Sequence, residues 1–175
     1  MRAPVVHIHD LPTDHVGPEG SNTFGATIAE VGEALGTKNI GAMYVQVEPG
    51  KRAFPFHNHL ANDEMFIILE GTGTYRFGDH TFDIKAGDIC HAPKGGKDTA
   101  HQIINTGQTT LRYLGLSTLQ DPEVVEYPDS DKFSVLGIHP GEDYHSRYFG
   151  HIGRRSDAYD YWDGEDVRKA VVPNE

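Results

Sequence analysis

The middle of the chain is a succession of short apolar segments separated by turn residues, and this pattern constrains the fold most. Glycine, proline or aspartate follows most of these segments, and Gly78-Asp79 predicts a hairpin turn. Many short strands with a turn about every eight to twelve residues predict an all-β sandwich or barrel. The best helix candidate, Ile28–Leu35, is interrupted by Gly32 and has room for about two turns. The expected strands span residues 40–48, 64–70, 73–77, 80–84, 88–92, 100–105 and 110–116.

The segment Met65–Leu69 is apolar throughout instead of alternating with polar residues. Successive side chains of a strand point to opposite faces, so a run of this kind is covered on both sides. One face is expected to line the barrel interior. The other must be covered by the terminal segments or by a second subunit, and we expect a homodimer.

Three regions are predicted within a chain of 175 residues, a length that suits one domain. Residues 1–36 form an N-terminal extension, with three prolines and a strand or two. Residues 37–120 form the barrel. Residues 121–175 form a C-terminal extension whose stretch 144–165 is too aromatic for a disordered tail. We expect this extension to pack on the barrel or on a partner, as a strap more than as a lid over a site.

Composition excludes several classes of function. The net charge of −11 disfavours general binding of nucleic-acid phosphates. No basic segment followed by an apolar run lies at the N-terminus, so we expect no secretory signal, and no apolar run approaches the length that spans a membrane. The lone Cys90 cannot form an internal disulfide, which fits a reducing compartment. These features predict a cytoplasmic protein with a small-molecule substrate and with neither nucleic acid nor membrane as a partner.

Histidine and carboxylate side chains come together in one short stretch. His57 and His59 are two residues apart, so both imidazoles project from the same face of an extended strand. Glu64 opens the next strand after a short loop. A further histidine, His101, shares a face with Ile103 on another expected strand. These four groups, His57, His59, Glu64 and His101, are the predicted ligands of one divalent metal ion.

Imidazole and carboxylate donors suit first-row divalent ions, and 11 histidines beside one cysteine favour such a site over a thiolate one. Four protein ligands leave two positions open on a six-coordinate ion, as in a catalytic site. Three neutral imidazoles and one carboxylate around an ion of charge +2 give the site a net charge of +1, which favours an anionic or chelating oxygen ligand. Manganese, iron, nickel and zinc all remain candidates.

The stretch 50–71 resembles the first motif of the cupin family, G-x₅-H-x-H-x₃₋₄-E-x₆-G. Gly50, His57, His59, Glu64 and Gly71 match it, with one extra residue between Gly50 and His57. The resemblance implies a double-stranded β-helix, also called a jelly-roll barrel, whose metal is held by the two histidines and the glutamate of this motif together with a histidine of the second.

The second cupin motif, G-x₅-P-x-G-x₂-H-x₃-N, is matched by Gly87, Pro93, Gly95, His101 and Asn105. Here five residues instead of two separate Gly95 from His101. We expect the extra residues to lengthen a turn and to leave the strand of His101 intact.

Three functions remain open, because one cupin barrel hosts many reactions. The chain is similar to single-domain cupins assigned as sugar-phosphate isomerases, which implies a metal-dependent enzyme for a sugar-phosphate-like or hydroxy-carbonyl substrate. Its general base is unassigned, since Glu64 is a metal ligand. The cage also resembles that of iron-dependent dioxygenases. A module that binds a small ligand without turnover is the third alternative.

Several other residues carry weaker hypotheses. Asp63 is expected to be a solvated loop carboxylate. Alternation allows only one of Cys90 and His91 to face inward. The loop from Lys94 to Lys97 is expected to be a solvated hairpin more than an anion-binding rim. Candidate wall residues of the pocket are Tyr44, Gln46, Arg76 and Tyr113.

Overall fold

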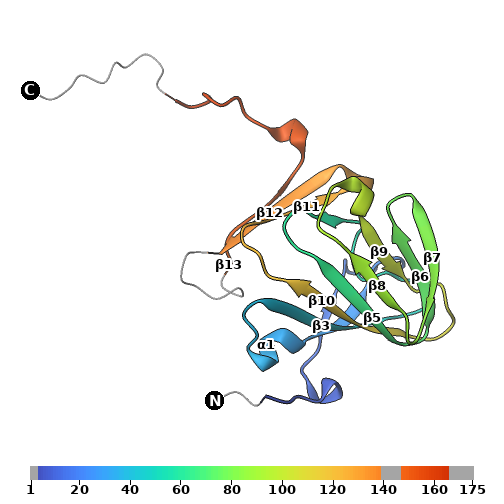
Figure 1. Cartoon of the computed structure of the whole chain (residues 1–175). Coiled ribbons are helices and arrows are strands. Elements are labelled where there is room, and N and C mark those ends of the chain that lie inside the picture. Colours follow the sequence, from blue (N-terminus) through green and yellow to red (C-terminus); the bar gives the residue numbers. More distant parts are fainter. Residues whose placement is uncertain (1–3, 139–146, 166–175) are drawn as a thin grey trace, which may run out of the picture.

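The computed structural model describes residues 4–138 and 147–165. Its strands form three antiparallel sheets (Figure 1), and side chains of the first two build the main core. The all-β, double-stranded β-helix prediction is confirmed. The largest sheet has the order β1 (Asp14–Val16), β2 (Ala26–Glu30), β3 (Ile40–Val47), β10 (Leu111–Thr118), β5 (Glu64–Glu70), β8 (Ile89–Ala92). The second has the order β7 (His80–Lys85), β6 (Thr72–Phe77), β9 (His101–Ile104). The third has the order β13 (Arg147–Gly153), β12 (Lys132–Ile138), β11 (Glu123–Tyr127), β4 (Asn58–His59).

Alternating side chains of facing strands build the core between the sheets. Phe66 and Ile68 of β5 meet Tyr75 of β6 and Ile103 of β9, all at most 8% exposed. Burying an aliphatic or aromatic side chain of this size contributes about 1.5–3 kcal/mol. Gly71 lets the chain turn between β5 and β6, because its φ is +86° and a Cβ would lie 2.8 Å from the carbonyl oxygen of Thr110.

The expected helix over Ile28–Leu35 is half wrong. Ala26–Glu30 is strand β2, and only Val31–Leu35 forms a helix, α1. Ile28 is paired with Val45 of β3 and packs into the core. Ladder pairing and burial therefore override the weak helical pattern there, and α1 ends at Gly36, whose φ is +71°.

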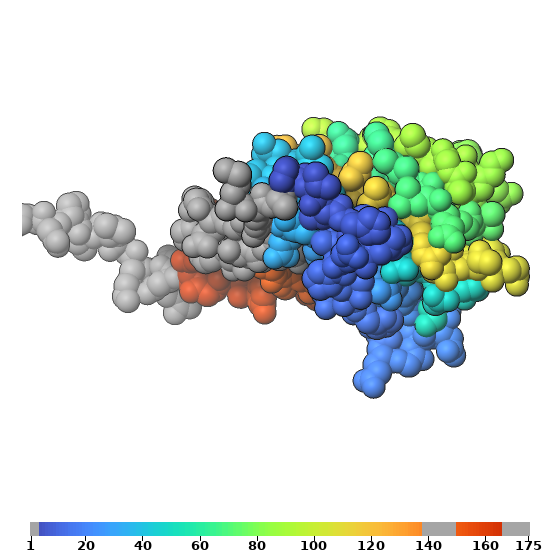
Figure 2. Space-filling model, turned by 90° about the horizontal axis from the view of Figure 1, so that it is seen from below, coloured from blue at the N-terminus to red at the C-terminus, as the bar shows by residue number. Residues whose placement is uncertain are grey.

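The outer face of β2 and β3 is covered by the chain itself. Ala29 and Tyr44 form a small second core, against which Val6, Ile8 and Leu11 of the N-terminal segment pack. In Figure 2 this segment, in dark blue, lies across the face of the molecule that is shown. The N-terminal extension thus covers part of the outer surface of the barrel.

The outer face of β5 is covered less completely. Met65 and Leu69 project away from Phe66 and Ile68 and are 42% and 40% exposed, and Ile89 of the neighbouring β8 is 65% exposed. The described terminal segments leave these side chains open. Cover by a second subunit therefore stays a prediction.

The C-terminal extension adds strands beside β4. Strand β11 pairs with β4, β12 with β11 and β13 with β12. The chain after β13 then leads away from the barrel (Figure 1), and Tyr159, Tyr161 and Trp162 are 84%, 85% and 62% exposed. The first residues of the aromatic stretch, 144–146, lie outside the described residues. No helix within the described ranges is long and apolar enough to cross a membrane.

Candidate metal centre

Backbone pairing places His57 beside His101. The two residues form an isolated antiparallel bridge, with hydrogen bonds from His57 N to His101 O of 3.2 Å and from His101 N to His57 O of 2.8 Å. Directly opposed residues of such a pair project to the same face. The five residues before His101 contain a 3₁₀ turn, Lys97–Thr99, and β9 begins at His101 itself. The expectation that the extra residues lengthen a turn and spare the strand is confirmed.

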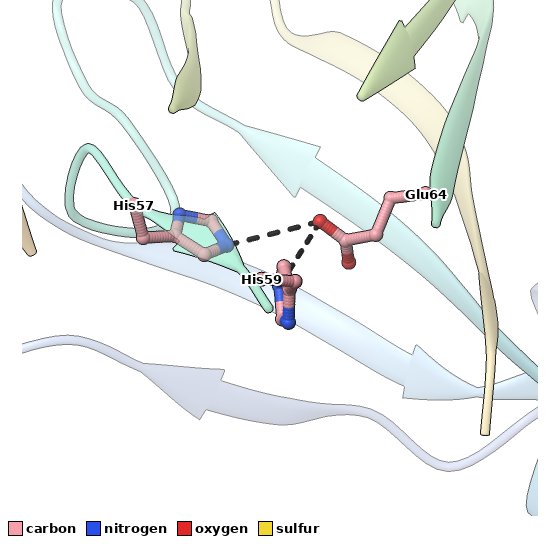
Figure 3. A group of neighbouring side chains, drawn as sticks. All are labelled: His57, His59 and Glu64. Atoms are coloured by element: carbon pink, nitrogen blue, oxygen red, sulfur yellow. Dashed lines mark ion pairs between the residues drawn. The ribbon is translucent and has the colours of Figure 1, made fainter. Parts of the chain in front are cut away.

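His59 and Glu64 complete the cluster from two other strands. His59, in β4, follows His57 by two residues, and Glu64 opens β5 in the large sheet. One oxygen of Glu64, Oε2, lies 3.8 Å from His57 Nε2, 3.2 Å from His59 Nε2 and 2.8 Å from His101 Nε2. Figure 3 shows His57, His59 and Glu64 pointing toward one another. For these three residues, one donor atom of each lies within 4.8 Å of the others, a separation at which they could hold a metal ion.

The Nδ1 atom of each imidazole lies near an oxygen on the side away from Glu64. His57 Nδ1 lies 2.8 Å from the carbonyl oxygen of Pro55, and His101 Nδ1 lies 3.4 Å from that of Thr99. His59 Nδ1 lies 3.3 Å from Glu123 Oε2. Histidines that bind a metal through Nε2 commonly place their Nδ1–H on a carbonyl or carboxylate in this way.

The contacts of His59 are close without being aligned for hydrogen bonds. Both of its ring nitrogens are buried and lack a hydrogen-bond partner among the described residues. A buried polar atom without a partner is costly and calls for an explanation such as an ion. The donor set and this orphaned nitrogen both fit a divalent cation, which Nε2 of His59 would help to bind.

The charges of the cluster depend on its mutual contacts. Burial, followed by the nearby His101, lowers the pKa of His57 to about 4, so this imidazole is neutral at pH 7. Burial opposes protonation of His59 as well, but Glu123 and Glu64 outweigh it and raise the pKa of His59 to about 9. Burial disfavours the charged form of Glu64, yet contacts with His101 and His59 hold its pKa well below the usual range. Without a metal, Glu64 is therefore ionised beside a protonated His59.

A cavity of about 260 Å³ opens beside the cluster. Its wall is mostly apolar, and none of its described lining residues is a lysine or arginine. The titratable groups in the wall are Glu30, Tyr113 and the cluster residues His57, His59 and Glu64. Burial, with Glu64 as a smaller contributor, raises the pKa of Tyr113, so its hydroxyl keeps its proton. The remaining lining residues are Gly41, Ala42, Met43, Val45, Phe54, Phe66, Gly115, Leu116, Ser117 and Leu119.

Of the four candidate wall residues, Tyr113 lines this cavity. Tyr44 belongs to the small second core on the outer face of β2 and β3. Gln46 accepts a hydrogen bond from Arg112, and Arg76 forms an ion pair of 2.6 Å with Asp129. These three side chains contribute to packing and surface contacts.

The structure also places Cys90, His91 and Asp63. Cys90 is buried in the core, whereas its neighbour His91 is exposed. Asp63 accepts a hydrogen bond of 2.8 Å from the backbone of Lys94 at the surface. The motif residue Asn105 is fully buried and donates to the carbonyl oxygen of Val47, so its role is to clamp a turn.

Sequence reasoning missed Glu30 and Glu123. Glu30 ends β2, in a segment expected to be helical, and lies in the cavity wall. Glu123 lies outside both motifs and reaches His59 through the pairing of β11 with β4. Neither residue has a spacing that relates it to the ligand cluster, so no local signal could have found it.

Comparisons with known proteins relate part of the chain to a described family. Residues 43–117 match the family model described as the Cupin domain. An oxalate-binding protein of Thermotoga maritima is 33% identical over 75 residues, which are 43% of this chain and 59% of that protein. An uncharacterised protein of Methanocaldococcus jannaschii is 32% identical over 74 residues, 40% of this chain and 57% of that protein. The matches thus span under two thirds of the length of these relatives.

Two crystal structures resemble the chain over more of its length. A putative sugar phosphate isomerase from Acidithiobacillus ferrooxidans superposes with a TM-score of 0.70 at 26% identity, covering 87% of this chain and 91% of that one. A predicted oxalate decarboxylase from Thermotoga maritima superposes with a TM-score of 0.56 at 27% identity, covering 66% of this chain and 99% of that one.

Proposed function

The chain carries a cupin domain at residues 43–117, and we propose that it is a metal-dependent enzyme for a small oxygenated substrate of the hydroxy-carbonyl type. The observation that supports this most is the approach of the Nε2 atoms of His57, His59 and His101 to one oxygen of Glu64, at the end of a cavity of about 260 Å³. We assign these four residues as the ligands of a divalent ion. Bound there, the ion would supply Lewis acidity toward a carbonyl oxygen.

Isomerisation of a hydroxy-aldehyde and a hydroxy-ketone is the reaction that we propose. It requires a base that is not a metal ligand, and within the described cavity wall Glu30 is the carboxylate other than Glu64. Glu30 would take the proton from the carbon next to the carbonyl and deliver a proton, exchangeable with solvent while it is held on the carboxyl group, to the former carbonyl carbon. The proton of the neighbouring hydroxyl would pass to the former carbonyl oxygen. The apolar wall formed by Phe54, Phe66 and Leu116 limits the access of water to the intermediate.

The cavity favours the hydroxy-carbonyl part of a sugar phosphate over its phosphate. None of the described lining residues is a lysine or arginine, and Glu30 and Glu64 contribute carboxyl groups to the wall. A phosphate group is usually recognised by arginine, lysine or backbone N–H groups. The likeness to the isomerase-type structure from A. ferrooxidans therefore supports a sugar-like substrate, while the lining makes short, unphosphorylated hydroxy-carbonyl compounds the first to test.

Capture of a small dicarboxylate without turnover is a second candidate. The oxalate-binding relative from T. maritima supports it, and so does a centre whose net charge with a divalent ion would be +1. Two adjacent oxygens of oxalate would chelate the ion in the same way as a hydroxy-carbonyl group.

One set of measurements separates these functions. Protein purified from its native host is assayed for bound metal, then incubated with C3 to C6 hydroxy-aldehydes in D₂O and followed by NMR. We expect interconversion of the aldehyde and ketone forms with deuterium incorporation, both lost in His59→Gln and kept in the surface variant His91→Gln. Thermal stabilisation by oxalate without any turnover would favour ligand capture. Oxygen uptake with phenolic or thiol substrates would identify a dioxygenase, and protein that binds no divalent metal would refute the proposal.

A further inference from the structure

Glu123 is a buried carboxylate that the C-terminal extension brings to the cluster. It is 6% exposed and opens β11, beyond the residues that match the cupin domain. Strand β11 pairs with β4 so that Val125 lies opposite His59. Glu123 precedes Val125 by two residues and therefore projects to the same side of the strand as Val125. The pairing of two segments far apart in the sequence thus places this carboxylate beside His59.

A network of hydrogen bonds fixes the orientation of the Glu123 carboxylate. Its Oε1 accepts from the backbone N–H groups of Ala61, at 3.2 Å, and Val124, at 2.8 Å. Its Oε2 accepts from the side-chain amide of Asn62. The amide oxygen of Asn62 is itself held by the hydroxyl of Thr118 at 2.9 Å. Because every partner is tied to the backbone or to another side chain, the carboxylate has little freedom to turn away.

The free side of Oε2 points at a ligand histidine. Oε2 lies 3.3 Å from His59 Nδ1, while His59 Nε2 lies 3.2 Å from Glu64 Oε2 on the other side of the ring. The imidazole is thus set between two carboxylates.

We propose that Glu123 is a positioning residue of the metal centre, which accepts the Nδ1–H of His59 and so directs the Nε2 lone pair toward the ion. The inference rests on the proposed function, because it requires His59 to be a metal ligand. A carboxylate on the second nitrogen selects the tautomer with Nε2 unprotonated, fixes the ring orientation and makes Nε2 a stronger donor. The distance is close to hydrogen-bonding range, so a change in ring tilt completes the bond. The cupin core of this chain is therefore completed by its C-terminal extension.

The test compares Glu123→Gln with the matched variant Glu126→Gln. Glu126 lies on the same strand and ties it to β4 by accepting from Asn58 at 3.0 Å, but it contacts none of the three histidines in the described structure. Metal-free proteins are titrated with Co²⁺, following the visible absorption of the bound ion, and with Zn²⁺ in competition with a chelator. We expect the affinity of Glu123→Gln to fall about 10- to 100-fold, the effect typical of removing such a partner. The affinity of Glu126→Gln should stay at the wild-type value.

A second measurement distinguishes positioning from a merely structural role and starts from the wild-type protein. In the Zn²⁺-loaded protein, NMR of the histidine side chains should show the Nδ1–H of His59 shifted downfield and protected from exchange. In Glu123→Gln that signal should move, while those of His57 and His101 stay in place. If Glu123→Gln does not fold, the wild-type spectrum decides, and a His59 Nδ1–H that exchanges like that of a solvent-exposed imidazole overturns the inference.

The outcomes distinguish failure of metal binding from failure of the role proposed for Glu123. Wild-type protein that binds neither Co²⁺ nor Zn²⁺ refutes the proposed function and this inference with it. Wild-type protein that binds the ions with an affinity equal to that of Glu123→Gln refutes the inference alone. Equal loss of affinity in Glu123→Gln and Glu126→Gln assigns the effect to the anchoring of β11 and also overturns the role proposed for Glu123.

Discussion

Replacement of His101 by glutamine tests whether this residue is a ligand of the ion. The side chain is 3% exposed, and its Nε2 lies 2.8 Å from Glu64 Oε2. Glutamine keeps a polar group but removes the imidazole. In metal-free protein, loss of a hydrogen bond to a charged group costs about 1.5–3 kcal/mol. At about 2–4 °C per kcal/mol for a chain of this size, Tm falls by about 3–12 °C.

The decisive quantity is the additional stabilisation that the ion provides. At an ion concentration of about 1,000 times Kd, wild-type protein gains about 4.1 kcal/mol, which raises Tm by about 8–16 °C. If the loss of one ligand weakens binding a hundredfold, the same concentration corresponds to only about 10 times the new Kd. The gain is then about 1.4 kcal/mol, or about 3–6 °C.

Thermal unfolding with and without Mn²⁺, Fe²⁺, Ni²⁺ or Zn²⁺ measures this difference for wild type, His101→Gln and the control His91→Gln. His91 is exposed on β8 and should respond to the ion like wild type. A His101→Gln variant with the full wild-type increase in Tm would refute the four-ligand assignment. It would leave His57, His59 and Glu64 as a sufficient site.

Glu30→Gln should retain metal binding but lower the isomerisation rate at least a hundredfold, because a general base contributes a factor of about 10²–10⁴. Unchanged turnover would contradict the role of Glu30 as the base. In chelator-treated protein, the pKa of His59 is about 9, above its unfolded value of about 6.5. The folded state binds this proton more tightly than the unfolded state does, so protonation of His59 adds on the order of 3 kcal/mol to the free energy of unfolding. This contribution is complete below about pH 6.5 and is lost as the pH rises through about 9. Urea unfolding across this interval should show the decline in wild type, and an equal decline in His59→Gln would exclude His59 as its source. The double variant Met65→Lys/Ile89→Lys should turn a dimer into a monomer in sedimentation, because both side chains are exposed on the outer face of the barrel, and a wild-type monomer would remove this prediction.

Local pattern was sufficient for the strands between residues 40 and 118 and for the motif spacing, but not for β2. It also missed β11, β12 and β13, which lie in a region predicted only as a packed extension. The segments around Met65 and Thr110 were predicted as strands because apolar runs bounded by turn residues are a property of the sequence itself. The start of the Ile28–Leu35 segment is a strand because Ile28 pairs with Val45, and that pairing is set by β3. The weak helical preference of this segment is outweighed by its backbone hydrogen bonds to β3 and by the burial of Ile28 in the core.

What the sequence by itself determined is the barrel and the H-x-H spacing, since a two-residue step along an extended strand puts His57 and His59 on one face whatever the rest of the chain does. Only the tertiary structure decided which groups surround that face. Pairing of β11 with β4 brings Glu123 to His59, and the position of β2 in the large sheet brings Glu30 to the cavity wall. The physical reason is that contacts between distant segments depend on strand order and register. A sequence motif carries neither.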